Sequence, residues 1–274
     1  MRKYSAAVVV VILFCFTTCA FSGDKLTLEQ LLSKHVDSIV TGKIKTAPLG
    51  RAGTGSAVRD VLLGGAGHRE GKATFVSKQN TFQLVLDFNS AEYQGEQYTW
   101  DGTQARVAAN GIDKFSAMAQ FVQAHDMVLR EGLFGGTLNN GWAMMTAALH
   151  NPKLHYDGLK KFNGRQLHQI TYTPKKNDNN MTIRLYFEPD TFRHVASTYE
   201  YESQVVAMAG NMPGSEKIVE RVEENFSDFR EEGGLTLPHH WQLRYNQEHG
   251  ASMSIRFEMD FPKVETGSTT ATGQ

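Results

Sequence analysis

Cysteine is almost absent from this sequence. Its 274 residues include only 2 cysteines, Cys15 and Cys19, and both lie close to the N-terminus. They fall in a segment with the pattern of an export signal, in which Arg2 and Lys3 precede an apolar run at residues 6–16. If that segment is removed, the mature chain contains no cysteine, which excludes disulfides and thiol chemistry.

The export signal is expected to span residues 1–22. Cleavage after Ala20 or after Ser22 would place small residues where a signal peptidase reads them. A lipid anchor on Cys19 is the alternative. We disfavour it because Phe16 and Thr17 fit the residues before a lipidated cysteine poorly. The sequence then predicts a single domain at residues 23–265 and a disordered polar tail at residues 266–274.

Long hydrophobic runs and an excess of either charge are also lacking. No later apolar run approaches the roughly 20 residues that a membrane-spanning helix needs, so we expect no transmembrane helix after signal removal. The formal net charge is -1 and the sequence pI is about 6.8. This balance gives no basic footprint, so nucleic acid is excluded as a partner.

Motifs for catalysis and metal binding are missing as well. His239 and His240 are adjacent, so on a strand their side chains face opposite sides and cannot easily share an ion. The sequence has no His-Glu-x-x-His, Cys-x-x-Cys or Gly-x-Ser-x-Gly pattern. The glycine-rich residues 64–67 lack the Lys-Ser/Thr ending of a phosphate loop, which favours a hairpin turn there. We therefore predict no metal, no cofactor and no enzymatic activity.

Alternation of apolar and polar residues is the dominant pattern. In residues 182–201, Ile183, Leu185 and Phe187 form one apolar series, and Pro189 then breaks the run before an extended pattern resumes. Residues 237–245 and 253–261 alternate in the same way. A period of two residues gives each strand one apolar and one polar face, and the turns between such runs favour hairpins.

Helical periodicity is confined to two stretches. Residues 28–40 place apolar side chains at spacings of three and four, and Thr27 and Gln30 can form a capping box at the start. Residues 114–130 repeat this spacing and predict a central helix. Residues 131–150 combine many glycines with large apolar side chains, and we interpret them as a mobile loop and a short second helix.

These elements predict an α+β fold, mainly β, built on one large curved antiparallel sheet. About ten or eleven strands are expected, whereas three helices about 10 Å wide cover only about six strands spaced about 4.8 Å apart. The sheet must therefore curl on itself, covered by the N-terminal helix and the central helical segment. Curling leaves an apolar interior, which side chains fill or a ligand occupies.

Two hairpin sequences resemble those of a known family. LYFEPDTFRHV at residues 185–195 and FSDFREEGGLTLPHHWQL at residues 226–243 are similar to segments of the LolA/LolB-like outer-membrane lipoprotein-sorting proteins. The resemblance extends over most of residues 24–264 and fits a poorly characterised branch of that superfamily. It implies a LolA-like open half-barrel whose hydrophobic cavity takes acyl chains, in a periplasmic protein.

The resemblance implies binding of a lipid or an acylated lipoprotein, by a carrier or a sensor in outer-membrane sorting. Inward-facing residues are expected to line the cavity: Leu185, Phe187, Trp241, Leu243, Phe257 and Met259. Residues of the central segment are expected to form its lid: Leu133, Phe134, Trp142, Met144 and Met145. The alternative is that the central segment is a permanent plug. The protein would then be an interaction module with a filled core, which takes no ligand and binds another protein of the cell envelope.

Overall fold

The computed structural model describes residues 26–41, 50–63, 67–111, 115–176, 180–209, 212–248 and 252–267. The side chains of residues 148–149, 205–209 and 212–215 are not described. The predictions on the export signal, on Cys19 and on the tail beyond residue 267 therefore lie outside the described residues. The last strand includes Thr266, so ordered structure extends at least one residue into the predicted tail.

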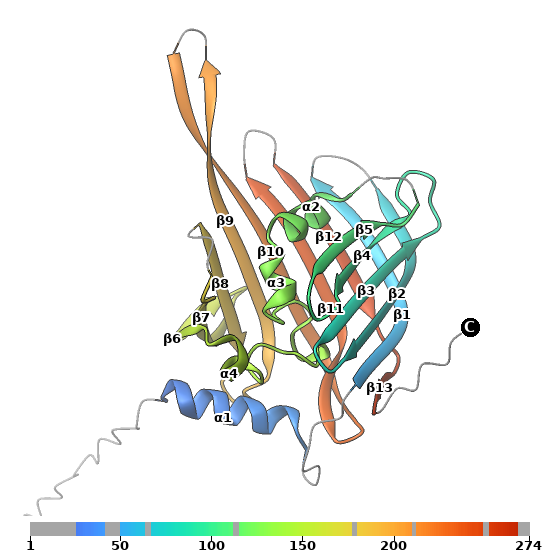
Figure 1. The fold of residues 1–274 in the computed structure, drawn as a ribbon, viewed down its shortest axis with the longest axis vertical. Coiled ribbons are helices and arrows are strands. Elements are labelled where there is room, and N and C mark those ends of the chain that lie inside the picture. Colours follow the sequence, from blue (N-terminus) through green and yellow to red (C-terminus); the bar gives the residue numbers. More distant parts are fainter. Residues whose placement is uncertain are drawn as a thin grey trace, which may run out of the picture.

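One antiparallel sheet of 13 strands dominates the molecule (Figure 1). This confirms the predicted fold, an α+β protein that is mainly β with a large open antiparallel sheet. The strands are β1 (Gly50–Leu63), β2 (His68–Lys78), β3 (Thr81–Phe88), β4 (Gly95–Trp100), β5 (Ala105–Ala109), β6 (Lys153–Phe162), β7 (Arg165–Thr173), β8 (Met181–Phe187), β9 (His194–Ala209), β10 (Met212–Glu232), β11 (Leu235–Glu248), β12 (Met253–Asp260) and β13 (Val264–Thr266). The helices are α1 (Leu28–Ile39), α2 (Ala117–Ala124), α3 (Met127–Arg130) and α4 (Ala147–His150), with the 3-10 helix η1 (Gly136–Leu138) between the last two.

Two meanders make up the sheet and meet where β1 pairs with β12. The order is β5-β4-β3-β2-β1-β12-β11-β10-β9-β8-β7-β6, with β13 paired to β1. The ends of this order, β5 and β6, are consecutive strands in the chain, so the chain between them must cross from one edge of the sheet to the other. That crossing carries α2, α3, η1 and α4 over the concave side of the sheet (Figure 1).

The register brings residues from distant strands into one row on the inner face. Leu185 lies opposite Ser197, which lies opposite Glu224. Glu224 lies opposite Leu243, which lies opposite Phe257. All five side chains are fully buried. The period-two predictions for β8, β11 and β12 are thus confirmed, and the row also places a carboxyl group in the apolar interior.

The N-terminal helix forms as predicted. The side chain of Thr27 accepts a hydrogen bond from the backbone of Gln30, and the Gln30 side chain accepts one from Thr27. One face of α1 buries Leu31, His35 and Ile39. The helix lies across one end of the sheet (Figure 1), so its apolar face covers that end of the interior.

The prediction of one continuous central helix at residues 114–130 is wrong. The chain forms two short helices, α2 and α3, that break at His125. The His125 ring packs 4.8 Å from the ring of Phe121 and 4.3 Å from that of Tyr201 on β9. These tertiary contacts turn the chain where helical periodicity alone would continue it. The expected second helix is also reduced, to the four residues of α4.

The first strand is longer than the residues 55–63 that alternation indicated. β1 begins at Gly50, and its first part contains Gly53 and Gly55. A Cβ atom at Gly55 would lie 1.8 Å from the backbone oxygen of Asp260 on β12. Glycine is needed here because β1 and β12 approach closely, and glycines carry no apolar alternation from which a strand is predicted.

Candidate ligand-binding site

The six residues predicted to line a cavity lie on the inner face of the sheet. All six side chains are fully buried. Trp241 lies directly opposite Met259, and Leu243 directly opposite Phe257. Leu185 and Phe187 on β8 are separated from these pairs by β9 and β10. All six belong to one hydrophobic core, which the structure brings together across five neighbouring strands; their role in binding stays a prediction.

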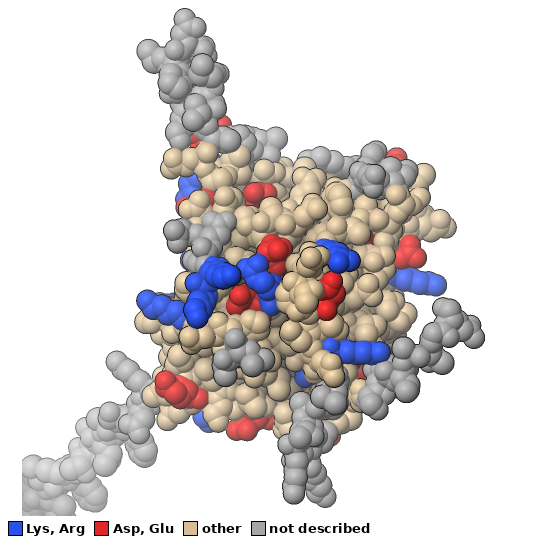
Figure 2. All heavy atoms as spheres, viewed as in Figure 1, with Lys and Arg blue, Asp and Glu red and all other residues tan. Residues whose placement is uncertain are grey.

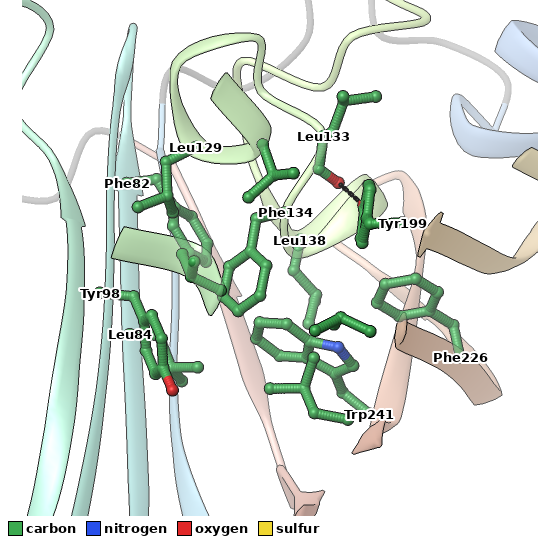
Figure 3. Packing of buried hydrophobic residues seen from close by; sticks show 14 of the residues in the cluster. Phe82, Leu84, Tyr98, Leu129, Leu133, Phe134, Leu138, Tyr199, Phe226 and Trp241 are labelled. Carbon is green, nitrogen blue, oxygen red and sulfur yellow. Dashed lines mark hydrogen bonds between the residues drawn. The ribbon is translucent and has the colours of Figure 1, made fainter. Parts of the chain in front are cut away.

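The residues predicted to form a lid are packed onto this face. Leu133, Phe134 and Trp142 are fully buried, Met144 is 5% exposed, and Met145 is half-buried. They belong to residues 131–146, which we call the central segment. The Phe134 ring lies between Tyr98 and Trp241, with its centroid 5.3 Å from each (Figure 3). In this structure the central segment is therefore part of the hydrophobic core and fills the space over the inner face.

Arg51 on β1 holds the middle of the central segment. Its Nη1 donates to the carbonyl oxygens of Thr137 and Asn139, the second at 3.1 Å. The side chain is fully buried. Burial lowers the pKa of Arg51 to about 10, so the guanidinium remains charged at neutral pH. Among the described residues, no group accepts from its Nε or Nη2.

Glu224 on β10 holds the start of the same segment. Its carboxylate accepts a 2.9 Å hydrogen bond from the backbone N–H of Gly135 and a 2.5 Å hydrogen bond from the hydroxyl of Tyr199. That hydroxyl also lies 3.2 Å from the carbonyl oxygen of Leu133 (Figure 3). Burial raises the pKa of Glu224 to about 7, although these hydrogen bonds act in the opposite direction.

His35 on α1 holds the end of the segment. Trp142 Nε1 donates a 2.9 Å hydrogen bond to His35 Nε2, and His35 Nδ1 donates to the carbonyl oxygen of Phe192 at 3.0 Å. Both ring nitrogens of the neutral imidazole are thus satisfied. Burial lowers the pKa of His35 to about 4, so the ring is neutral at physiological pH.

Sequence reasoning assigned no anchoring role to any of these three residues. Glu224 carried a usable signal, because Val222 and Phe226 flank it at a spacing of two on the same strand face. A carboxyl group at an inward position is a buried polar group that needs partners. Arg51 carried no such signal, since it stands among alanine and glycine residues and its partners lie 86 and 88 residues away.

Open space lies elsewhere on the molecule. A groove of about 710 Å³ runs between the ends of β2 and β3 and is lined largely by polar residues, among them Lys72, Asp87 and Asn110. None of the eleven predicted site residues lines this groove or the three smaller surface pockets formed by residues within the ranges 105–126, 52–76 with 263–265, and 180–217. Cationic and anionic side chains are interspersed on the face seen in Figure 2.

Metal-binding clusters and membrane-spanning helices were searched for in the described residues. No group of three or more His, Cys, Asp or Glu side chains gathers there in a way that would hold a metal ion. Within the same residues, no helix has the length and apolar character needed to cross a membrane.

Comparisons with known proteins give matches at the level of structure alone. No family model matches the sequence, and no curated protein matches it. A candidate outer membrane lipoprotein-sorting protein domain from Vibrio parahaemolyticus aligns with 89% of this chain and 92% of its own, at 7% identity and a TM-score of 0.44. A LolA superfamily protein from Nitrosomonas europaea aligns with 88% of this chain and 94% of its own, at 10% identity and a TM-score of 0.45.

A more distant match is the MucA/MucB complex of Pseudomonas aeruginosa, at 7% identity and a TM-score of 0.23, over 87% of this chain and 98% of that one. The first two matches name the superfamily that the hairpin sequences resemble. Identities and TM-scores of this size transfer no ligand, partner or activity to the present chain.

Proposed function

We propose that this protein is a non-enzymatic binding protein of the periplasm that holds the acyl chains of a lipid or lipoprotein on the inner face of its sheet. The export pattern at residues 1–22 and the family resemblance of the hairpins support the compartment and the ligand class. The proposal requires the central segment to leave the inner face, because its side chains fill that face in the described structure.

The observation that carries the proposal is how the central segment is attached. Within the described residues, no backbone–backbone hydrogen bond joins residues 131–146 to a strand. The segment has one 3-10 turn and otherwise irregular structure, and its polar ties to the sheet all involve side chains such as Arg51 and Glu224. Its departure would therefore leave the hydrogen-bonded sheet intact and expose an apolar surface.

The energies involved are of similar size. Exposing five buried apolar side chains of the segment costs about 1.5–3 kcal/mol each, or about 7–15 kcal/mol together. One acyl chain of about 14 methylenes gains about 11 kcal/mol when it is buried, at about 0.8 kcal/mol for each methylene. A single chain roughly balances the cost and two chains exceed it, which favours a ligand with more than one acyl chain.

Titration with a fluorescent fatty acid and with a fluorescent diacyl phospholipid tests this proposal. We expect both probes to gain fluorescence in the protein's presence, the diacyl probe at lower concentration. Proteolysis within residues 131–146 should become faster when probe is bound, because the segment leaves the core. Absence of uptake for both probes would contradict the proposal.

A second candidate is an interaction module with a permanently filled interior that binds an envelope protein. The buried anchors Arg51, Glu224 and His35 favour it, because each ties the central segment to a different element. Buried polar groups of this kind fix one arrangement of a core. The two candidates differ in what Trp142→Ala does: a lid predicts weakened ligand uptake beyond the loss of stability, whereas a plug predicts loss of stability alone.

A further inference from the structure

Arg51 holds the central segment with one of its three guanidinium nitrogens. Nη1 donates to the carbonyl oxygens of Thr137 and Asn139. Nε and Nη2 are buried, and neither has a hydrogen-bond partner among the described residues. Their N–H groups lie parallel on one edge of the planar guanidinium, and a carboxylate or a phosphate accepts from such an edge with two oxygens. Arg51 therefore keeps one anion-binding edge unused inside the core.

The charge of Arg51 also has no counter-ion in the described part of the chain. Burial is the sole influence on its pKa, which it lowers to about 10. An arginine with a carboxylate partner behaves differently, since a hydrogen bond to Asp60 raises the pKa of Arg256. Burial of a charge is costly unless an opposite charge and hydrogen bonds accompany it. A group that brought both to Arg51 would bind there with a gain in free energy.

The neighbouring anchors add no charge at pH 6. Glu224 is protonated below its pKa of about 7, which burial has raised. His35 is neutral above its pKa of about 4, and burial lowers the pKa of the nearby His194 well below its usual value. Arg51 is thus the one charged side chain among these four, and a ligand that replaces the central segment meets a positive charge.

Arg51 lies on the same face of the sheet as the predicted cavity residues. Burial alternates along the first part of β1, with Arg51, Gly53 and Ala57 on the inner face. Ala57 lies opposite Met259. Six residues separate Arg51 from Ala57 along the strand, which is about 20 Å at about 3.3 Å per residue. A ligand with its polar end at Arg51 therefore has an apolar surface along which its chain can extend.

We propose that Arg51 binds an anionic headgroup, a carboxylate or a phosphate, of the acyl ligand that the inner face takes. This inference rests on the proposed function, because Thr137 and Asn139 leave Arg51 when the central segment moves. The guanidinium then loses both carbonyl acceptors, and an acyl chain offers none in their place. An anionic headgroup supplies two oxygen acceptors and the opposite charge, which fits the planar guanidinium.

Two matched pairs of probes test this inference on the wild-type protein at pH 6, where a free carboxylic acid is ionised and Glu224 is protonated. A fluorescent fatty acid is compared with its methyl ester, and a fluorescent phosphatidic acid with the diacylglycerol of the same chains. We expect the anionic member of at least one pair to bind about 10–100-fold more tightly, the range expected for hydrogen bonds to a charged group. The pair that shows the preference identifies the headgroup as a carboxylate or a phosphate.

The outcomes separate this inference from the proposed function. Uptake of all four probes, with equal affinity inside each pair, would overturn the headgroup assignment and leave the proposed function standing. Absence of uptake for all four probes would overturn both.

Variants at Arg51 assign the preference to this side chain. Arg51→Gln should bring the affinity ratio inside each pair close to one, and Arg51→Lys, which keeps the charge without the parallel N–H groups, should keep a reduced preference. Both probes of a pair meet the same variant, so a loss of stability alone does not change their ratio. A preference that Arg51→Gln leaves unchanged would overturn the inference.

Arg244 provides the matched control. It is half-buried on β11 and follows the inward-facing Leu243, so it lies on the outer face of the sheet. Arg244→Gln removes the same charge from the protein and should keep the wild-type preference. A loss of preference as large as that in Arg51→Gln would contradict the inference, because it would assign the effect to the overall charge of the protein.

Discussion

The indole of Trp142 donates a 2.9 Å hydrogen bond to Nε2 of His35, a residue 107 positions earlier in the chain. It joins the central segment to α1 inside a core in which both side chains are fully buried. Two parts of the cover over the sheet are thus coupled through one polar contact. Release of the central segment would leave His35 without its partner and loosen α1 as well.

Replacement of Trp142 by phenylalanine isolates this contact. Trp142→Phe keeps most of the buried apolar area but leaves His35 Nε2 unpaired, so we expect a loss of about 1–3 kcal/mol in the free energy of unfolding. Denaturant unfolding measures the change. Trp100→Phe is the matched control, because within the described residues Trp100 Nε1 has no hydrogen-bond partner. A loss at Trp100 as large as that at Trp142 would assign the effect to packing.

His35 should make the protein less stable in acid. Its folded pKa is about 4, because burial opposes the charged form, against an ordinary value of 6.5. The unfolded chain therefore takes up the proton first, and stability falls as pH decreases from 6.5 through 4. The loss approaches about 3 kcal/mol at 1.36 kcal/mol per pKa unit. His35→Gln should flatten this part of the profile, and an unchanged slope in that variant would contradict the assignment.

Glu224 should act in the opposite direction. Burial raises its folded pKa to about 7 from 4.5, so the folded state holds a proton that the unfolded chain releases. The stability that this gives is complete below pH 4.5 and is lost as pH rises through 7, by about 3 kcal/mol. Glu224→Gln keeps an acceptor for the Gly135 N–H and removes the ionisation. The free energy of unfolding, measured from pH 5 to 9, should fall as pH rises in the wild type and should fall less in the variant.

Gly55 marks the junction of the two meanders. Because an added Cβ would meet the Asp260 backbone oxygen, Gly55→Ala should cost about 1–3 kcal/mol, as overpacking does elsewhere. Gly67→Ala is the control, since its Cβ would come no closer than 3.8 Å to Val61. Thermal unfolding of both variants compares them. Equal unfolding midpoints of the two variants would contradict this prediction, because they would mean that β1 and β12 can move apart at Gly55 at little cost.

Local pattern predicted much of the fold but not how distant parts meet. Alternation in β8, β11 and β12 was sufficient because each has one buried face. The pairing of β1 with β12 could not be predicted, since no turn joins them and the glycines of β1 carry no pattern. The break at His125 arises from contact with Tyr201, which helical spacing cannot reveal.

In the candidate site, too, local pattern predicts some features and contacts between distant residues determine the others. The inward positions of Trp241, Leu243, Phe257 and Met259 follow from period two, whereas the filled interior follows from tertiary packing of the central segment. Whether that segment is a lid or a plug depends on the free energy of moving it. Anchors such as Arg51 contribute to this free energy. The partners of Arg51 are backbone carbonyl groups, which every residue type carries, so they cannot be identified from the sequence.

Native mass spectrometry of the mature protein, gently extracted from the envelope of its own host, tests the central claim most directly. The proposed function predicts added mass that corresponds to a lipid or an acylated peptide and that organic solvent removes. A clean mass of the polypeptide, together with no uptake of the diacyl probe, would contradict it and assign the central segment to a permanent core.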